Sequence, residues 1–369
     1  MNPITIPHGS IDPLLRSYES EFTLCRGEYH TAGAWSYGSN LSMLRGSSAL
    51  RGSGSRCTVL RLNSPGEFIG TIPCTYYQLL TGGGHNAPAV RTEVSGLSID
   101  AAAGKPVKAL QIWGTGVSVQ DVVVVNVAGR RDVLEGEGFG ILVNNAGPNL
   151  IDGGNRIENC VVQVWPGSYA CAVYLGTELT RTRYPGVSVP HDRALLWSEV
   201  CDTVAVSVTS PENRSHCGFG INSRTRLTRC QSHGFDRAIF SDTGDGIDAE
   251  IRAFFASGCS IGVEFRSSTA AWPRRRILVE DSTFIFGGGQ GGYVAGLVLA
   301  DDAPAGASAR PEMTDIVFRG CRFVNESGQP GHVGSSSGAA IAPAVFEGCQ
   351  WIGKWDRKQA DAARWQFVA

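Results

Sequence analysis

The sequence lacks several features that would mark a familiar class of protein. No window approaches the roughly 18 consecutive apolar residues of a transmembrane helix, so we expect no membrane span. The first eight residues, Met1-Asn-Pro-Ile-Thr-Ile-Pro-His, show neither the basic segment nor the apolar segment of a secretory signal. This favours a cytoplasmic protein or a phage particle over classical secretion. The 32 basic and 34 acidic side chains form no basic stripe, and we expect no nucleic-acid partner.

The cysteines and glycines exclude further classes. Eleven cysteines include no CxxC pair, so the usual zinc-binding spacings are absent, and free thiols in a reducing compartment fit better than a disulfide scaffold. Forty-seven glycines without a G-X-Y period exclude collagen and indicate many tight turns. Hydrophobic residues make up 42% of the chain, which is enough for a continuous core and too many for a disordered protein.

A short pattern recurs along most of the chain: apolar, any residue, Asp/Asn/Gly-like, small or Cys, any residue, apolar. Five intervals between successive copies are 24 to 28 residues, and three are 38 to 43 residues. The short interval is about one three-strand coil of a β-solenoid, and the long ones are the same coil with a loop inserted. The copies begin at Val94, Val119, Ile157, Val200, Leu227, Ile251, Val279, Phe318 and Phe346.

A second strand follows most copies, with the form Gly/Ala-apolar-x-apolar, as in Ala172-Val-Tyr-Leu. Two short strands per coil without a helical period predict a single right-handed parallel β-helix (all-β). An antiparallel sandwich is the competing fold, but it explains neither the interval nor the cysteines that recur at one position, which we expect to be buried and unpaired: Cys160, Cys230, Cys321 and Cys349. We expect an N-terminal arm, cap and first coil over 1–40, coils over 41–350 and a C-terminal cap over 351–369.

The first 65 residues carry a family resemblance. The segments Phe22-Thr-Leu-Cys-Arg-Gly-Glu-Tyr, Leu44-Arg-Gly-Ser-Ser-Ala-Leu-Arg-Gly-Ser-Gly and Thr58-Val-Leu-Arg-Leu resemble the opening coils of pectate-lyase-like β-helix proteins. That resemblance implies the parallel β-helix fold and a function among lyases, hydrolases, epimerases and phage tailspikes that act on saccharides. The clustered aspartates of polygalacturonases and the arginine block of pectate lyases are both absent, so the resemblance does not select the chemistry.

Alternation along the second strands predicts a candidate catalytic face. With neighbouring coils ~4.8 Å apart, Asp242 is expected between Arg224 and Arg266, with Glu264 roughly 8 Å away. That separation fits an inverting glycoside hydrolase in which Asp242 is the base and Glu264, beside Phe240, is the acid. The two arginines could instead neutralise a uronate or abstract a proton in β-elimination. Alternatively, Arg224, Asp242 and Arg266 could form a surface ladder that only separates like charges.

Further residues are expected to bind the substrate. They are Tyr174, Asn222, Phe240 and Trp113 on the strands, and Glu178 and His191 in the long insertion that would wall the groove. We interpret His216 and His233 as turn residues. The spacing of Asp242, Asp245 and Asp248 matches no EF-hand, so we expect no cofactor, with Ca²⁺ the one alternative.

Three classes of function remain open. The first is an enzyme that cleaves or modifies an oligosaccharide, such as a glycoside hydrolase, polysaccharide lyase or epimerase. The second is a tailspike or adhesin module that binds saccharide, for which a homotrimer would be expected. The third is an intracellular β-helix enzyme that acts on a small molecule in secondary metabolism.

Overall fold

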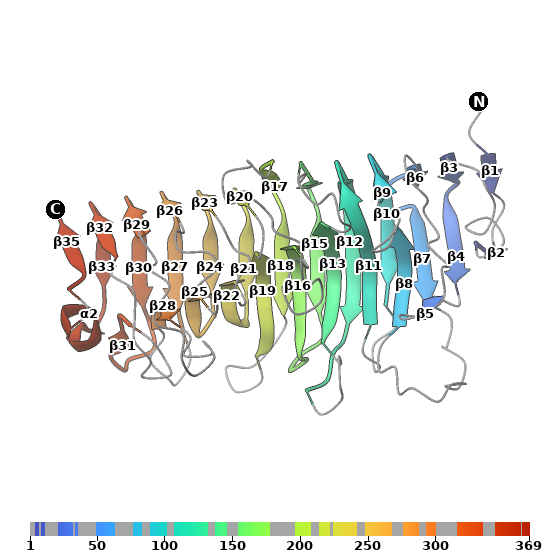
Figure 1. The fold of residues 1–369 in the computed structure, drawn as a ribbon. Coiled ribbons are helices and arrows are strands. Elements are labelled where there is room, and N and C mark those ends of the chain that lie inside the picture. The colour runs from blue at the N-terminus through green and yellow to red at the C-terminus, as the bar shows by residue number, and fades with distance from the viewer. Residues whose placement is uncertain are drawn as a thin grey trace, which may run out of the picture.

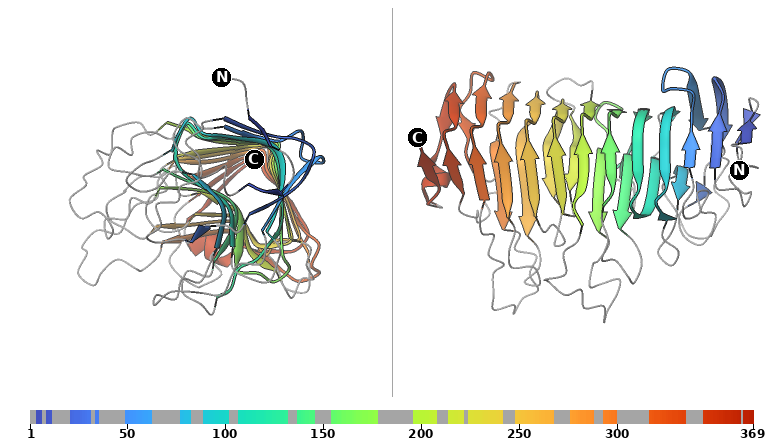
Figure 2. Two further views of the ribbon diagram at one scale, coloured as in Figure 1. Left: turned by 90° about the vertical axis from the view of Figure 1, so that its right-hand side faces the viewer. Right: turned by 90° about the horizontal axis from the view of Figure 1, so that it is seen from above.

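The protein is an elongated stack of coils with the two termini at opposite ends (Figure 1). It is seen in a computed structural model that describes residues 4–6, 9–11, 21–31, 34–35, 49–62, 77–82, 89–101, 107–131, 137–145, 154–177, 196–207, 214–221, 224–241, 248–267, 276–287, 293–299, 316–334, 344–362 and 364–369. Seen along the stack, successive coils superimpose around one common core (Figure 2).

Sheet A contains 23 of the described strands and supplies two arms of each coil. The first arm consists of β1 (Ile4–Ile6), β3 (Glu21–Leu24), β6 (Ala49–Arg51), β10 (Glu93–Asp100), β12 (Ser118–Val127), β14 (Arg156–Glu158), β17 (Ser198–Cys201), β20 (Thr225–Thr228), β23 (Ala249–Arg252), β26 (Ile277–Glu280), β29 (Ile316–Arg319), β32 (Val345–Glu347) and β35 (Gln366–Val368). The second arm consists of β2 (Gly9–Ser10), β4 (Gly27–Thr31), β7 (Thr58–Leu62), β15 (Val161–Val164), β18 (Val204–Ser207), β21 (Gln231–His233), β24 (Phe255–Ser257), β27 (Thr283–Phe286), β30 (Arg322–Asn325) and β33 (Gln350–Ile352). The long strands β10 and β12 run through both arms.

Sheet B contains 12 of the described strands and forms the third side of the coil. They are β5 (Ala34–Trp35), β8 (Tyr77–Gly82), β9 (Ala89–Val90), β11 (Val107–Thr115), β13 (Gly138–Asn145), β16 (Ala170–Thr177), β19 (Ser215–Ile221), β22 (Phe235–Ser241), β25 (Ile261–Ser267), β28 (Tyr293–Leu299), β31 (Gly331–His332) and β34 (Trp355–Asp356). Among the described strands every pairing is parallel except that of β5 with β8. The described chain contains a single helix, α2 (Lys358–Ala362), and has no helix that could cross a bilayer. The predicted parallel β-helix is confirmed.

The repeated pattern marks a one-residue turn between the two arms of sheet A. The third residue of every copy has left-handed φ, between 50° and 63°. These residues are Gly96, Asp121, Asn159, Asp202, Arg229, Ala253, Asp281, Gly320 and Gly348. Gly, Asn and Asp adopt this conformation at the lowest cost, which explains their excess at the third position.

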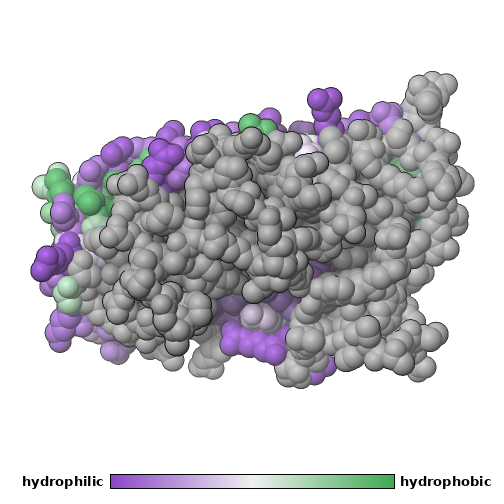
Figure 3. Space-filling view, in the orientation of Figure 1, coloured by the Kyte–Doolittle hydropathy of each residue, from purple (hydrophilic) through white to green (hydrophobic). Residues whose placement is uncertain are grey.

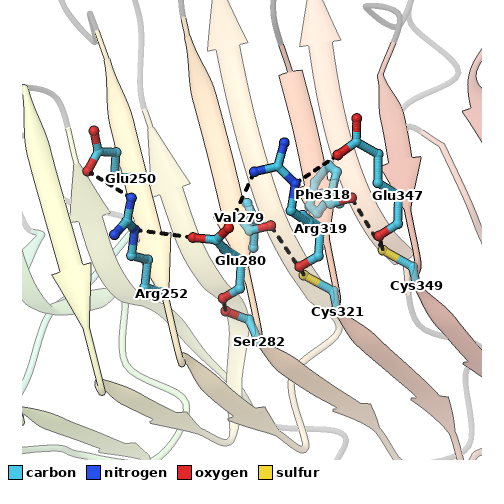
Figure 4. Close-up of polar contacts among 10 residues, drawn as sticks. All are labelled: Glu250, Arg252, Val279, Glu280, Ser282, Phe318, Arg319, Cys321, Glu347 and Cys349. Atoms are coloured by element: carbon cyan, nitrogen blue, oxygen red, sulfur yellow. Dashed lines mark hydrogen bonds and ion pairs between the residues drawn. The ribbon is translucent and has the colours of Figure 1, made fainter. Parts of the chain in front are cut away.

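The fourth residue of the pattern secures the turn. Cys321 Sγ donates to the carbonyl of Val279 in the preceding coil at 3.3 Å, and Cys349 Sγ donates to that of Phe318 at 3.4 Å (Figure 4). Ser282 occupies the same position and donates its hydroxyl proton to Glu280 O at 2.8 Å. All ten described cysteines are free; Cys160, Cys230 and Cys321 are buried, as predicted, whereas Cys349 is half-buried. Small donors at this position therefore stabilise the turn, and the repeated cysteines are structural.

The core is a set of apolar columns in which like residues stack. The first residue of each copy lies in register with the next: Val94, Val119, Ile157, Val200, Leu227, Ile251, Val279, Phe318, Phe346 and then Phe367. Towards the C-terminus the column becomes aromatic, and Phe318 stacks on Phe346 with centroids 4.6 Å apart. Trp351 and Trp355 pack against this end of the core. Strands continue into the expected cap, since β35 pairs with β32, and Figure 3 shows hydrophobic surface at this end, where Ile352 and Val368 are exposed.

The outer face of sheet A carries charges that alternate from coil to coil. Arg252, Glu280, Arg319 and Glu347 occupy one register column, and each arginine contacts the carboxylate of a neighbouring coil at 2.8 to 3.4 Å (Figure 4). Because like residues would otherwise stack directly, alternation of sign removes like-charge repulsion. The arginines of this column are about half exposed, so it is a surface ladder.

Candidate active site

The strands of sheet B bend, and the bend decides which side chains face outward. In β16 both Ala172 and Val173 lie in the main core, whereas Cys171 and Tyr174 belong to a second apolar cluster outside it. Two consecutive inward residues therefore break the simple alternation of a strand. The inward position before the bend is occupied by Ala or Gly in six successive coils: Ala109, Gly140, Ala172, Gly218, Ala238 and Gly262. At Gly140 a Cβ would lie 2.3 Å from Val162 Cγ1, so a larger side chain has no room there.

The bend leaves two outward columns on sheet B. The column before it contains Lys108, Phe139, Cys171, Cys217, Arg237 and Ile261. The column after it contains Gln111, Leu142, Tyr174, Gly220, Phe240 and Glu264. Phe139, Leu142, Cys171, Cys217 and Phe240 are all buried, so much of this outer face is covered.

A buried ion pair interrupts this apolar face. The Nε of Arg237 donates to Glu264 Oε2 at 2.7 Å, and its Nη1 donates to Asp236 Oδ2 at 2.6 Å. Burial by itself would lower the pKa of Arg237, but the charges of Glu264 and Asp236 outweigh that effect, and the pKa is raised. The Arg237 guanidinium also lies 5.2 Å from the ring centroid of Phe240. Arg237 is therefore charged, and it is held by groups on two sides.

His216 connects this ion pair to a further carboxylate. Arg237 Nη1 lies 3.4 Å from His216 Nδ1, and the other ring nitrogen, Nε2, lies 3.5 Å from Glu137 Oε1. The imidazole packs on the ring of Tyr169, with centroids 4.6 Å apart, and meets Phe240 edge-on at 5.4 Å. Four side chains from β22, β25, β19 and the residue before β13 thus form one chain of contacts: Glu264, Arg237, His216 and Glu137.

Of the four side chains in this chain of contacts, that of Glu137 is the most exposed. The side chains of Glu264, His216 and Arg237 are 2%, 9% and 13% exposed, whereas that of Glu137 is 29% exposed. Glu137 is therefore the member of the chain with the largest solvent-accessible fraction. Asp236, 34% exposed and bound to Arg237, offers a second carboxylate. Together these groups can exchange a proton with a bound molecule and orient the group that does so.

The two thiols beside this chain are not suited to attack a substrate. Cys171 and Cys217 lie in register on adjacent strands and are both buried. Burial, and then the neighbouring Cys171, raises the pKa of Cys217 well above its ordinary value. The reactive form of cysteine is the thiolate, so Cys217 is held in its unreactive state. Among the described residues, no group of three or more His, Cys, Asp or Glu is arranged to hold a metal ion.

Comparison with known proteins gives matches by structure. No family model and no curated protein matches the sequence. Polygalacturonase from Erwinia carotovora ssp. carotovora superimposes with a TM-score of 0.51 at 8% identity, covering 97% of each chain. The catalytic domain of a GH87 α-1,3-glucanase in complex with tetrasaccharides gives 0.50 at 12% identity, covering 100% of this chain and 68% of its own. A surface adhesin of Streptococcus pneumoniae, PfbA, gives 0.50 at 11% identity, covering 97% and 86%.

These identities bear on the fold alone. The chain has the right-handed pectate-lyase-like β-helix fold. The predicted fold class, which is also the fold that the N-terminal resemblance implies, is therefore confirmed.

The predicted site residues have different places on this β-helix. Glu264, Tyr174 and Phe240 do lie in one outward column. Glu264, however, is buried in its pair with Arg237, so it is not placed to act directly as the acid on a substrate. Tyr174 covers Gly220, since a Cβ there would lie 2.4 Å from the Tyr174 ring.

Arg224 lies elsewhere than predicted. Gly218-Phe and Gly220-Ile both fit the second-strand pattern, and the prediction aligned Ile221 with Val173. The structure aligns Phe219 with Val173 instead. Arg224 consequently falls beyond the end of β19 and pairs with Asp248 at 3.3 Å, which Arg276 also contacts at 2.9 Å. An Arg–Asp–Arg ladder exists, but its carboxylate is Asp248 and it lies beside sheet A.

Other predicted residues lie outside the described chain. These are Asp242, Asn222, Glu178 and His191, and also Asp245 of the calcium alternative. Trp113 and Arg266 are described only as backbone positions in β11 and β25. The sequence interpretation missed Glu137, Asp236 and Arg237 and assigned His216 to a turn. In fact His216 lies in β19, and His233 lies in β21, hydrogen-bonded to Ser257 at 2.8 Å.

Proposed function

We propose that the protein is a carbohydrate-active enzyme that binds a saccharide on the outer face of sheet B and exchanges a proton with it through Glu137. The observation that carries this proposal is the chain of contacts from buried Glu264 through Arg237 and His216 to the partly exposed Glu137 carboxylate. Saccharide as the substrate class is supported by the structural neighbours, among them a polygalacturonase and a glucanase in complex with tetrasaccharides.

The charged chain is difficult to explain by stability alone. Neighbouring positions in the same two columns are occupied by Phe139, Leu142 and Phe240, so this face can be filled with apolar side chains. A buried ion pair loses the hydration of both ions, and apolar residues of similar volume usually stabilise a fold at least as well. Clusters of buried titratable groups that end on an accessible carboxylate are typical of active sites.

Glu137 is the group that we expect to move the proton. It is the more exposed end of the chain, and the imidazole of His216 lies behind it. Proton transfer at a saccharide also needs a group to stabilise the charge that develops. Arg237 lies beside the same imidazole and holds the carboxylate of Asp236. The rings of Tyr169 and Phe240 pack on His216 and supply apolar surface of the kind that sugars cover.

The test compares Glu137→Gln with wild type on a panel of acidic and neutral oligosaccharides. Glu347→Gln is the matched control, because Glu347 also pairs with an arginine but lies on the opposite, sheet A face. Mass spectrometry separates hydrolysis, which adds water, from elimination, which leaves an unsaturated end, and NMR detects epimerisation, which changes no mass. We expect Glu137→Gln to lower turnover by about 10²- to 10⁴-fold and Glu347→Gln to leave it unchanged.

The alternative is a saccharide-binding module without turnover, which the similarity to a surface adhesin supports. In that case wild-type protein would bind a saccharide of the panel, the bound saccharide would be recovered unchanged, and Glu137→Gln would alter only affinity. Equal turnover by wild type and Glu137→Gln would also reject the proposed role of Glu137.

A further inference from the structure

Glu264 occupies a position from which it reaches the site only through other side chains. Its carboxylate is buried and accepts the Nε proton of Arg237 at 2.7 Å. Arg237 in turn is fixed at Nη1 by Asp236 at 2.6 Å and faces His216 Nδ1 at 3.4 Å. Two carboxylates therefore hold the guanidinium in the plane from which it meets the imidazole.

This contact determines which nitrogen of His216 carries the proton. A guanidinium has only donors, so the Nδ1 atom that faces Arg237 must act as an acceptor and carries no proton. The proton of a neutral imidazole then lies on Nε2, the atom that faces Glu137 Oε1 at 3.5 Å. The orientation of the donor towards Glu137 thus depends on the orientation of Arg237.

We propose that Glu264 is a positioning residue, which acts through Arg237 to hold His216 as its Nε2-protonated tautomer and thereby to orient Glu137. The consequence for turnover rests on the function proposed above for Glu137, whereas the tautomer itself does not. Asp236 binds the same guanidinium at Nη1 alone, so it cannot replace the contact at Nε when Glu264 is removed.

The tautomer can be measured directly in the intact protein. Histidine labelled with ¹⁵N distinguishes a protonated from an unprotonated ring nitrogen by chemical shift, and the variant His216→Asn identifies the signals of His216 among the seven histidines. At a pH where His216 is neutral, we expect wild type to show protonated Nε2 and unprotonated Nδ1. Glu264→Gln, which keeps an acceptor oxygen, should retain that pattern, and Glu264→Ala should give a mixture of the two tautomers.

A matched control separates this role from a general loss of structure. Glu280 also binds arginines of neighbouring coils, but on sheet A, so Glu280→Ala should leave the signals of His216 unchanged. Unchanged signals of the other histidines in Glu264→Ala would show that its fold is intact. Where the substrate is known, Glu264→Ala should lower kcat by about 10- to 100-fold with little change in KM, and Glu264→Gln should recover most of that loss.

Two results would overturn the proposal. One is a wild-type His216 protonated on Nδ1, and the other is a Glu264→Ala protein that keeps the wild-type tautomer. Failure of the proposed function has a different signature: Glu137→Gln would then retain full turnover while the histidine signals still followed Glu264.

Discussion

Removing one partner of the Arg237–Glu264 pair should be much more harmful than removing both. In Arg237→Met the carboxylate of Glu264, only 2% exposed, would remain buried without its partner at Nε. Loss of one partner from a buried pair costs about 3–5 kcal/mol of folding free energy, because the remaining charge is neither hydrated nor compensated. The double variant Arg237→Met/Glu264→Leu removes both charges and keeps similar volumes, so its free energy of unfolding should lie within about 1–2 kcal/mol of wild type.

Urea unfolding of the wild type and the variants measures these differences. The urea midpoint should fall markedly in Arg237→Met and recover in the double variant. The slope of the free energy of unfolding against urea concentration should be similar in both variants. The unfolding transitions followed by circular dichroism and by tryptophan fluorescence should coincide. The double variant should be folded but should show at least the loss of about 10- to 100-fold in kcat expected for Glu264→Ala, because its His216 no longer faces a guanidinium. If Arg237→Met is as stable as wild type, Glu264 is not a buried charge, and the argument for a functional chain fails.

Two further outcomes concern the turn of the repeated pattern. A thiol reagent at neutral pH should modify Cys349 faster than Cys160 or Cys230, because a hydrogen bond from Cys321 lowers the pKa of Cys349, whereas burial raises that of Cys160 and of Cys230 to about 12. Raising the pH should accelerate the modification of Cys160 and Cys230. Equal modification rates for Cys349, Cys160 and Cys230, measured by peptide mass mapping, would contradict this order of reactivity. Gly348→Val should reduce the free energy of unfolding by about 1–2 kcal/mol, and Gly348→Asn should reduce it by less. A Cβ at this position meets no atom within 4 Å, so the two variants differ only in how well each residue tolerates the φ of 58°. Equal stability of the two variants in urea would refute that explanation.

The sequence predicted the coils well because the turn between the arms of sheet A depends on single residues. A left-handed residue favours Gly, Asn or Asp, and the next position favours a small donor, so both leave a local signal such as Asn159-Cys160. The signal survives even where Ala253 occupies the turn, because the flanking apolar residues keep the same spacing. Local requirements of this kind can be recognised without an alignment.

The candidate site was predicted less well because simple alternation was assumed to hold along sheet B. Alternation places Arg237 on the same side as Ile239, in the core, and so hides it from any list of outward residues. The bend at Ala238 reverses its direction. Two signals could have revealed this: the column of Ala and Gly residues before the bend, and the cost of an arginine at a nominal core position. Register was the second difficulty, because Gly218 and Gly220 fit the pattern equally well and only the three-dimensional pairing separates them.

The two charged chains of the molecule show why burial, and not the presence of ion pairs, points to function. On sheet A, Arg252, Glu280 and Arg319 alternate along the surface, where both arginines are about half exposed and the pairing mainly avoids like-charge contacts (Figure 4). On sheet B, Arg237 and Glu264 are largely removed from water, in the two outward columns that elsewhere hold Phe139 and Leu142. Apolar side chains fill the neighbouring positions, so the desolvation of these charges needs compensating contacts, of which that between His216 and Glu137 is one. A ligand that uses the carboxylate of Glu137 would explain such a chain of buried charges, and for that reason the proposed saccharide site is on sheet B.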